Sequence, residues 1–162
     1  MKYIPRSAKG YILLAAFFIL LPTLNSLYTG QENRFLLVSP VIGADGVFHQ
    51  TVVYIEKHDL LTGARGYIVN RPVPGRENVF YGGLSGQPEH IVTIDFGEER
   101  RTFQGYARWV PLLLEYEMMR GIWSVVPDGD RVTVFSDDYK GLWRDLDVRV
   151  REAPHLRDNP VY

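Results

Sequence analysis

The chain contains no cysteine among its 162 residues, so disulfide bonds, thiolate metal sites and cysteine nucleophiles are excluded. It also has no surplus of positive charge. Removing Lys2, Arg6 and Lys9 leaves 15 basic residues against 19 acidic ones from Glu32 onward, which is a net charge near −4. Nucleic-acid-binding domains usually carry a positive surplus, because phosphate neutralisation dominates their affinity. We therefore expect no nucleic-acid partner.

Familiar patterns of catalytic and metal-binding residues are absent as well. No histidine pairs at helical spacing with another histidine or a glutamate in a metal-ligand pattern. Asp128 and Asp130 are similar to the start of a calcium loop, but Tyr139 stands at the twelfth position, where such a loop needs glutamate. Ser85 lacks the G-x-S-x-G context of a hydrolase nucleophile. We expect no metal, no cofactor and no enzymatic activity.

A long uncharged run occupies the N-terminus. The 22 residues from Gly10 to Gln31 include no charged side chain. At about 1.5 Å per residue, a helix of this length spans the roughly 30 Å hydrocarbon core of a bilayer. The sequence therefore predicts a transmembrane anchor over residues 10–31. Its large apolar side chains, expected to face lipid, are Tyr11, Leu14, Phe17, Phe18 and Leu21.

Two other interpretations of this run stay open. A cleaved signal peptide has the same basic start and apolar middle, although Leu24-Asn25-Ser26 is a poor cleavage site. A buried core helix is the third interpretation, but the run lacks the polar face that a helix packed on a small domain usually shows. Pro22 and Asn25 weaken the last third of the run as an anchor.

The charges that flank the run predict its orientation. Lys2, Arg6 and Lys9 precede it, and only Arg34 lies close behind it. Positive residues stay on the cytoplasmic side of a membrane helix, so we expect residues 1–9 in the cytoplasm. The rest of the chain would then lie in the periplasm, held to a bacterial inner membrane by a single pass.

Beyond the run, the chain reads as one domain over residues 32–150 and a polar tail over residues 151–162. Runs of β-branched and aromatic residues predict strands at 35–39, 51–55, 66–70, 79–81, 90–96, 122–126 and 131–135. Residues 111–120 predict the main helix, because Pro111 begins it and Gly121 follows it, and residues 139–146 predict a short final helix. This pattern favours an α+β fold, a single small domain with a mixed, mostly β core and one main helix, over a doubly wound sheet.

The most suggestive loop is the glycine-rich stretch from Gly82 to Gly86. Consecutive backbone N–H groups in such a turn can hold an anion, and an arginine can add a planar guanidinium beside them. The candidate ligand site comprises Asn70, Arg71, Gly82, Gly83, Ser85 and Gly86. The alternative is structural: the glycines form a tight turn with positive φ, and Asn70-Arg71-Pro72 ends a strand.

Five stretches of the domain follow one another in a characteristic order. They are Phe48–Ile55, Gly63–Pro72 (GARGYIVNRP), Tyr81-Gly82-Gly83, Gly105–Trp109, and Leu114–Glu117 followed by Trp123. Taken together they resemble the YqgE/AlgH family of small bacterial proteins over about Phe35 to Leu146. The resemblance implies a compact α+β fold and brings no established catalytic residues. Some members are linked to transcriptional regulation, which fits poorly with an acidic domain placed across a membrane from DNA.

The chain departs from the family pattern at several positions. Leu84 stands where members usually have a proline, and Arg108 stands where they have a small residue. Leu112-Leu113 replaces the Gly-Gln of a G-Q-L-E start to the main helix. The segment between Pro72 and Gly82 is shorter than usual, and typical members lack a membrane segment. The resemblance therefore implies a diverged, membrane-anchored relative.

Two functions are compatible with these observations. The first is a non-enzymatic, membrane-anchored accessory or scaffold subunit that docks on a respiratory, photosynthetic or envelope membrane protein complex. Its partners would be that complex and the lipid bilayer, because anchoring raises the effective concentration for weak docking. The second is a ligand-sensing or regulatory module that binds a small anion near Gly82–Gly86. Co-purification with a membrane complex favours the first, and loss of anion binding in Arg71→Ala favours the second.

Overall fold

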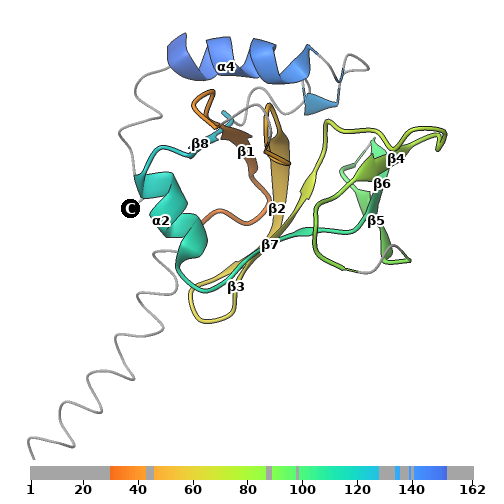
Figure 1. The fold of residues 1–162 in the computed structure, drawn as a ribbon, viewed down its shortest axis with the longest axis horizontal. Helices are drawn as coiled ribbons and strands as arrows, with labels where there is room; N and C mark the ends of the chain where they lie inside the picture. Colours follow the sequence, from red (N-terminus) through yellow and green to blue (C-terminus); the bar gives the residue numbers. More distant parts are fainter. Residues whose placement is uncertain are drawn as a thin grey trace, which may run out of the picture.

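The computed structural model describes residues 30–42, 46–86, 89–97, 99–127, 134–135, 139 and 141–152. Within these residues the first sheet has five antiparallel strands in the order β7-β3-β2-β1-β8 (Figure 1). In chain order the strands are β1 (Phe35–Val38), β2 (Val52–Asp59), β3 (Gly63–Ile68), β7 (Ala107–Trp109) and β8 (Trp123–Val125). This order places β2 at the centre of the sheet, between β3 and β1.

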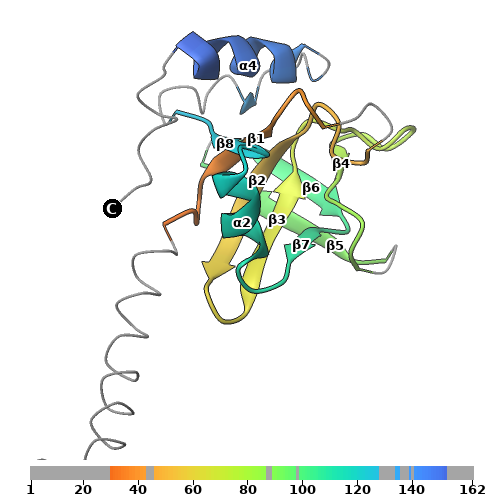
Figure 2. The same ribbon diagram turned by 60° about the vertical axis from the view of Figure 1, so that its left-hand side comes forward.

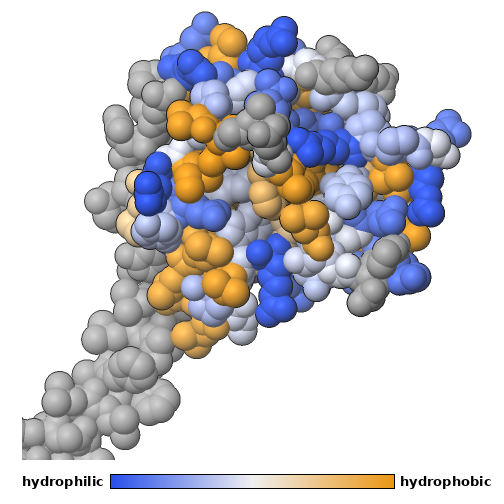
Figure 3. All heavy atoms as spheres, in the orientation of Figure 1, coloured by the Kyte–Doolittle hydropathy of each residue, from blue (hydrophilic) through white to orange (hydrophobic). Residues whose placement is uncertain are grey.

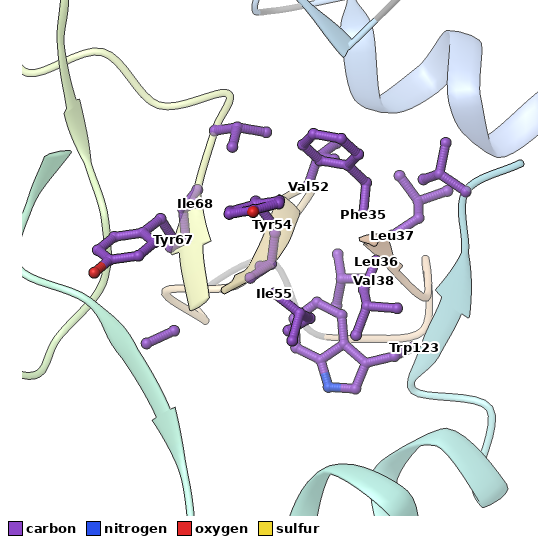
Figure 4. Packing of buried hydrophobic residues seen from close by; sticks show 14 of the residues in the cluster. Phe35, Leu36, Leu37, Val38, Val52, Tyr54, Ile55, Tyr67, Ile68 and Trp123 are labelled. Atoms are coloured by element: carbon purple, nitrogen blue, oxygen red, sulfur yellow. The ribbon is translucent and has the colours of Figure 1, made fainter. Parts of the chain in front are cut away.

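The central strands are apolar on both faces. All of β1 and the first four residues of β2 are buried, which is the pattern of strands covered on two sides. Phe35 and Tyr54 stand opposite each other and lie on one face, whereas Ile55 and Trp123 lie on the other (Figure 4). The sheet therefore needs a covering layer on each side.

A second, three-stranded sheet provides cover on one side. It contains β4 (Val79–Tyr81), β5 (Ile91–Asp95) and β6 (Arg100–Gln104) in the order β4-β6-β5, with β4 parallel to β6. Aromatic rings join the two sheets: the Tyr54 and Phe96 centroids are 4.8 Å apart, and those of Tyr67 and Phe103 are 5.0 Å apart. Burial of several rings in one layer supplies much of the hydrophobic stabilisation of a domain this size.

Two helices among the described residues complete the fold. Helix α4 (Leu142–Glu152) buries Leu142, Trp143, Leu146 and Val150 on one stripe and lies against β1, where the Trp143 indole donates to the Val38 carbonyl at 3.0 Å. Helix α2 (Leu113–Met119) lies beside the β2–β3 hairpin, well away from α4, in both ribbon views (Figures 1 and 2). Leu114 is its one fully buried side chain, with Met118 partly buried against the core, and polar contacts described below also attach it to the sheet.

A buried arginine links the second sheet to the aromatic layer. Arg101 is 4% exposed, and its guanidinium lies 4.6 Å from the ring centroid of Phe80 and 4.9 Å from that of Phe135. It also donates to the Val69 carbonyl at 2.7 Å. Cation–π contacts and a backbone acceptor stabilise a charge that is otherwise costly to bury.

The predicted α+β class with a mostly β core is confirmed. Strands appear at six of the predicted positions, and the predicted helix at 111–120 is α2. The final helix begins and ends later than predicted, at Leu142 and Glu152, so residues 151 and 152 are helical and not tail. Strands β6 and β7 were not predicted, because Arg100-Arg101 and Arg108 interrupt their apolar pattern. Most of the predicted strand at 131–135 and residues 153–162 of the predicted tail lie outside the described residues.

The predicted anchor also lies outside the described residues, apart from Gly30 and Gln31 at its end. Its named side chains, Tyr11, Leu14, Phe17, Phe18 and Leu21, are all among residues 1–29. In the part of the chain that the structure describes, no helix combines the length and the apolar character needed to cross a bilayer.

Candidate anion-binding site

A row of three cationic side chains crosses neighbouring strands of the first sheet. Lys57 on β2 pairs with Arg65 on β3, and Arg65 pairs in turn with Arg108 on β7. Residues directly opposite each other on antiparallel strands project from the same face, with Cβ atoms about 5 Å apart. Like charges in such positions destabilise a sheet. A negative charge bound near the row would therefore reduce this repulsion and stabilise the sheet.

The row lines a shallow, open hollow of about 240 Å³. The lining residues are Lys57, Thr62, Gly63, Ala64, Arg65, Tyr106 and Arg108. Gly63 shapes one wall: its φ is +87°, and a Cβ there would lie 2.1 Å from the Trp109 carbonyl oxygen. Only glycine allows the β2–β3 turn to approach β7 this closely.

The charges of the row are only partly compensated by the residues that the structure describes. Arg65 Nε lies 2.6 Å from Glu56 Oε2. Glu56 is the residue of β2 at which the β2–β3 register shifts. Burial works to lower the pKa of Arg65, but the hydrogen bond and negative charge of Glu56 outweigh it and raise the pKa above its ordinary value. Lys57 and Arg108 are exposed, and neither forms an ion pair with a described residue. Two cations of the row are thus free to meet an anion.

Tyr106 connects this hollow to the glycine-rich loop. The Arg65 guanidinium lies 6.0 Å from the Tyr106 ring centroid on the side of the hollow. The same ring contacts the loop, since a Cβ at Gly86 would lie 3.0 Å from its Cε1 atom. Ser85 forms an isolated bridge with Tyr106, donating to its carbonyl at 2.9 Å and accepting from its N–H at 3.0 Å. The predicted loop and the observed cationic row are therefore neighbours.

Two backbone donors of the predicted loop, the N–H groups of Gly82 and Ser85, are used within the fold. The N–H of Gly82 donates to the Gln104 carbonyl at 2.8 Å. A Cβ at Gly82 would lie 2.2 Å from the Gly105 carbonyl oxygen, and one at Gly83 would lie 2.3 Å from the Tyr106 carbonyl carbon. These two glycines thus serve a close approach of two backbone segments. Gly86, with φ +87°, adopts the positive φ of the structural alternative.

Asn70 and Arg71 lie next to this loop through their backbones, but their side chains turn to another segment. The Tyr81 N–H donates to the Arg71 carbonyl at 2.7 Å. The Asn70 amide donates to the Gln50 carbonyl at 2.9 Å and accepts from the Val52 N–H at 2.9 Å. The Arg71 guanidinium donates to the His49 carbonyl, and burial lowers its pKa. Anion binding by the loop residues stays a prediction.

Sequence reasoning missed a polar cluster beneath α2. His58 is 2% exposed, and its Nε2 atom lies 2.7 Å from Glu115 Oε1. Glu117 Oε2 accepts from the Trp109 indole at 2.8 Å and from the Trp123 indole at 2.7 Å. The two carboxylates therefore fasten the helix to strands β2, β7 and β8. The stretches of the resemblance that contain Trp109, Leu114–Glu117 and Trp123 were the sequence features that pointed here.

Sequence reasoning also missed the cationic row. Lys57, Arg65 and Arg108 share no sequence spacing that a motif would reveal, and only the strand register brings them together. Arg108 appeared in the sequence as a departure from the family pattern, which was the single available signal.

No protein-family model matches the chain. A UPF0301 protein of Gluconobacter oxydans is 25% identical over an alignment of 183 residues that covers 82% of this chain and 97% of that protein. The solution structure of the AlgH protein from Pseudomonas aeruginosa aligns with a TM-score of 0.50 and 21% identity over 82% of this chain and 90% of that one. These matches support the YqgE/AlgH family.

A crystal structure of a Corynebacterium diphtheriae protein is similar in fold. Its TM-score is 0.60 at 16% identity, over 74% of this chain and 87% of that one. The similarity to both solved structures concerns the fold alone at these identities. The family resemblance inferred from the five ordered stretches and the α+β architecture thus agree.

The prediction that the chain is a membrane-anchored relative of this family is corrected by these comparisons. The matched proteins are UPF0301 and AlgH proteins, one of them solved in solution, and no described helix is suited to cross a bilayer. The predicted single-pass inner-membrane protein with a periplasmic domain, and its role as an anchored accessory subunit of a membrane complex, are contradicted. Those predictions rested on the length and hydropathy of one uncharged run. Length alone is a weak criterion for a run that Pro22 and Asn25 interrupt.

Proposed function

We propose that the domain is a non-enzymatic binding module whose hollow accepts a carboxylate or phosphate group of its ligand. The observation that supports this is the row of Lys57, Arg65 and Arg108, in which two of the three cations have no carboxylate partner among the described residues. Arginine offers a planar fork to either anion, and lysine adds a point charge beside it. The favourable contacts with an anion offset the repulsion within the row.

The surroundings of the row favour a local contact over recognition of a long polyanion. The chain from Glu32 onward is net acidic, so its long-range field repels a nucleic acid. The strand spacing makes the row about 10 Å long, enough for one or two anionic groups. The lining of the hollow contains neither a histidine nor a carboxylate that would act as a general base, which favours binding over catalysis.

The proposal is tested by titrating the full chain with inorganic pyrophosphate as the probe, followed by NMR or calorimetry. We expect saturable binding that weakens about tenfold or more in Arg108→Gln, since a charged hydrogen bond contributes about 1.5–3 kcal/mol. Arg144→Gln is the matched control, because Arg144 is an exposed arginine on α4. Equal affinity in the two variants, or no binding by the wild type, would contradict the proposal.

A further inference from the structure

Helix α2 and the residues that lead into it expose an apolar surface. Leu112, Tyr116 and Met119 follow one another at helical spacing on the outer side of α2, and Met119 is 80% exposed. Val110 and Leu113 extend this surface, which we call the α2 face. A small domain rarely leaves a contiguous group of large apolar side chains in water unless it serves an interaction.

One residue of the α2 face adopts a costly backbone conformation. Leu112 occupies the N-cap of α2 in the left-handed region, at φ +66° and ψ −4°, without a side-chain cap. Glycine or asparagine is the usual residue in that region, and the family pattern has glycine there. The leucine side chain is 56% exposed, so its burial within this chain contributes too little hydrophobic stabilisation to offset the backbone strain. The strain is explained if Leu112 contributes apolar contact area to a partner.

The α2 face continues directly from the cationic row. Arg108 precedes Val110 by two residues, and Gly63 of the hollow packs against the backbone of Val110 and Pro111. The space-filling view shows hydrophilic side chains over β3 and β7 beside hydrophobic ones over the start of α2 (Figure 3). A ligand seated in the hollow would therefore reach the α2 face without leaving the surface.

We infer that the hollow and the α2 face together bind a segment of another protein that carries acidic side chains beside apolar ones. This inference rests on the proposed function, because the cationic row supplies the contact for the acidic group. The apolar contact extends the length of α2, about 10 Å beyond the hollow, which is more than a small anion spans. The cationic row has room for one or two anionic groups and the domain around it is net acidic, so local charge complementarity favours a short protein segment over an extended anionic lipid surface.

The test selects binding peptides from a random display library against the full chain and measures their affinity in solution. We expect the selected sequences to combine Asp or Glu with Leu, Ile, Phe or Met. Met119→Ser should weaken binding at least about fivefold, since a buried methionine side chain contributes substantially to an interface. Val148→Ser, which removes a 49% exposed side chain from α4, should leave binding unchanged.

The outcomes separate this inference from the proposed function. If Arg108→Gln weakens pyrophosphate binding but no peptide is selected, or Met119→Ser binds peptides normally, the protein-segment inference is wrong and the anion site stands. If the selected peptides lack acidic residues and Arg108→Gln binds them normally, the inference that an acidic segment occupies the hollow is wrong. If pyrophosphate does not bind, or binds Arg108→Gln and Arg144→Gln equally, the proposed function itself fails. If Met119→Ser impairs binding to vesicles of anionic phospholipid and not to peptides, the occupant is a lipid surface and the inference is overturned.

Discussion

The Nε2 atom of His58 on β2 lies 2.7 Å from the Oε1 atom of Glu115 on α2, in a place where the histidine is 2% exposed. Helix α2 has only seven residues, and Leu114 is its one fully buried side chain, so polar contacts add to the apolar packing of Leu114 and Met118. The contact with His58 fixes the helix, and with it the α2 face, relative to the cationic row on the same sheet.

Glu115→Ala is therefore expected to destabilise the protein. The substitution leaves the buried His58 ring without its acceptor, and an unsatisfied buried polar group costs about 1–3 kcal/mol. Urea unfolding of the full chain measures the loss. Glu77→Ala, which removes an exposed carboxylate from the 73–78 loop, is the control and should change the free energy of unfolding by less than about 0.5 kcal/mol. Equal stability of the two variants would show that the contact contributes nothing.

Gly82→Ala should disrupt the junction between the two sheets. A Cβ at this position lies 2.2 Å from the Gly105 carbonyl oxygen, which is backbone and cannot rotate away. We expect a loss of about 2 kcal/mol or more, typical of overpacking in a tight site. Gly30→Ala is a suitable control, because a Cβ there has nothing within 4 Å. Equal melting temperatures for Gly82→Ala and Gly30→Ala would argue against the close approach of Gly82 to Gly105.

Local patterns sufficed to predict much of the sheet and its main helix. Thr51–Ile55 is β-branched and aromatic, and Pro111 and Gly121 flank an apolar periodicity, so propensity and packing agree at these places. Strand β6 was missed because its sequence begins with two arginines. The buried guanidinium of Arg101 is compensated by the rings of Phe80 and Phe135 and by the Val69 carbonyl, which come from distant parts of the chain. Such tertiary compensation has no local signature.

The candidate site was less accessible to sequence reasoning. The glycines at 82 and 83 drew attention as an anion cradle, whereas their packing against Gly105 and Tyr106 gives them a structural reason. Lys57, Arg65 and Arg108 form a row only through the register of three strands. Register depends on turn geometry and on which faces are buried, and neither is visible until the strands are paired.

Leu112→Gly should separate stability from binding. Glycine tolerates a φ of +66° without the cost of about 1 kcal/mol that leucine incurs there, so the free energy of unfolding should stay equal or rise by up to about 1 kcal/mol. The same change removes apolar area from the α2 face, so affinity for the selected peptides should fall. Chemical unfolding and peptide binding on the same sample check both effects. If Leu112→Gly were less stable than the wild type and bound the selected peptides with unchanged affinity, both the strain at Leu112 and its role in binding would be contradicted.

Tyr67 should make stability depend on pH in the alkaline range. Burial, and then the charge of Glu56, raise the pKa of this phenol from 10.0 to about 12. Above pH 10 the unfolded chain releases the proton while the folded protein keeps it until about pH 12. The contribution of Tyr67 is thus fully present below pH 10 and decreases between pH 10 and 12, by at most about 2.7 kcal/mol.

Tyr67→Phe removes this titration without removing the ring that packs on Phe103. Urea unfolding at a series of pH values from 9 upward should therefore show a steeper loss of stability in the wild type than in the variant. Tyr81→Phe, an exposed tyrosine, serves as the control and should follow the wild type. If the wild type and Tyr67→Phe lose stability in parallel, the phenol of Tyr67 ionises as readily in the folded protein as in the unfolded chain, and the burial argument for its raised pKa is wrong.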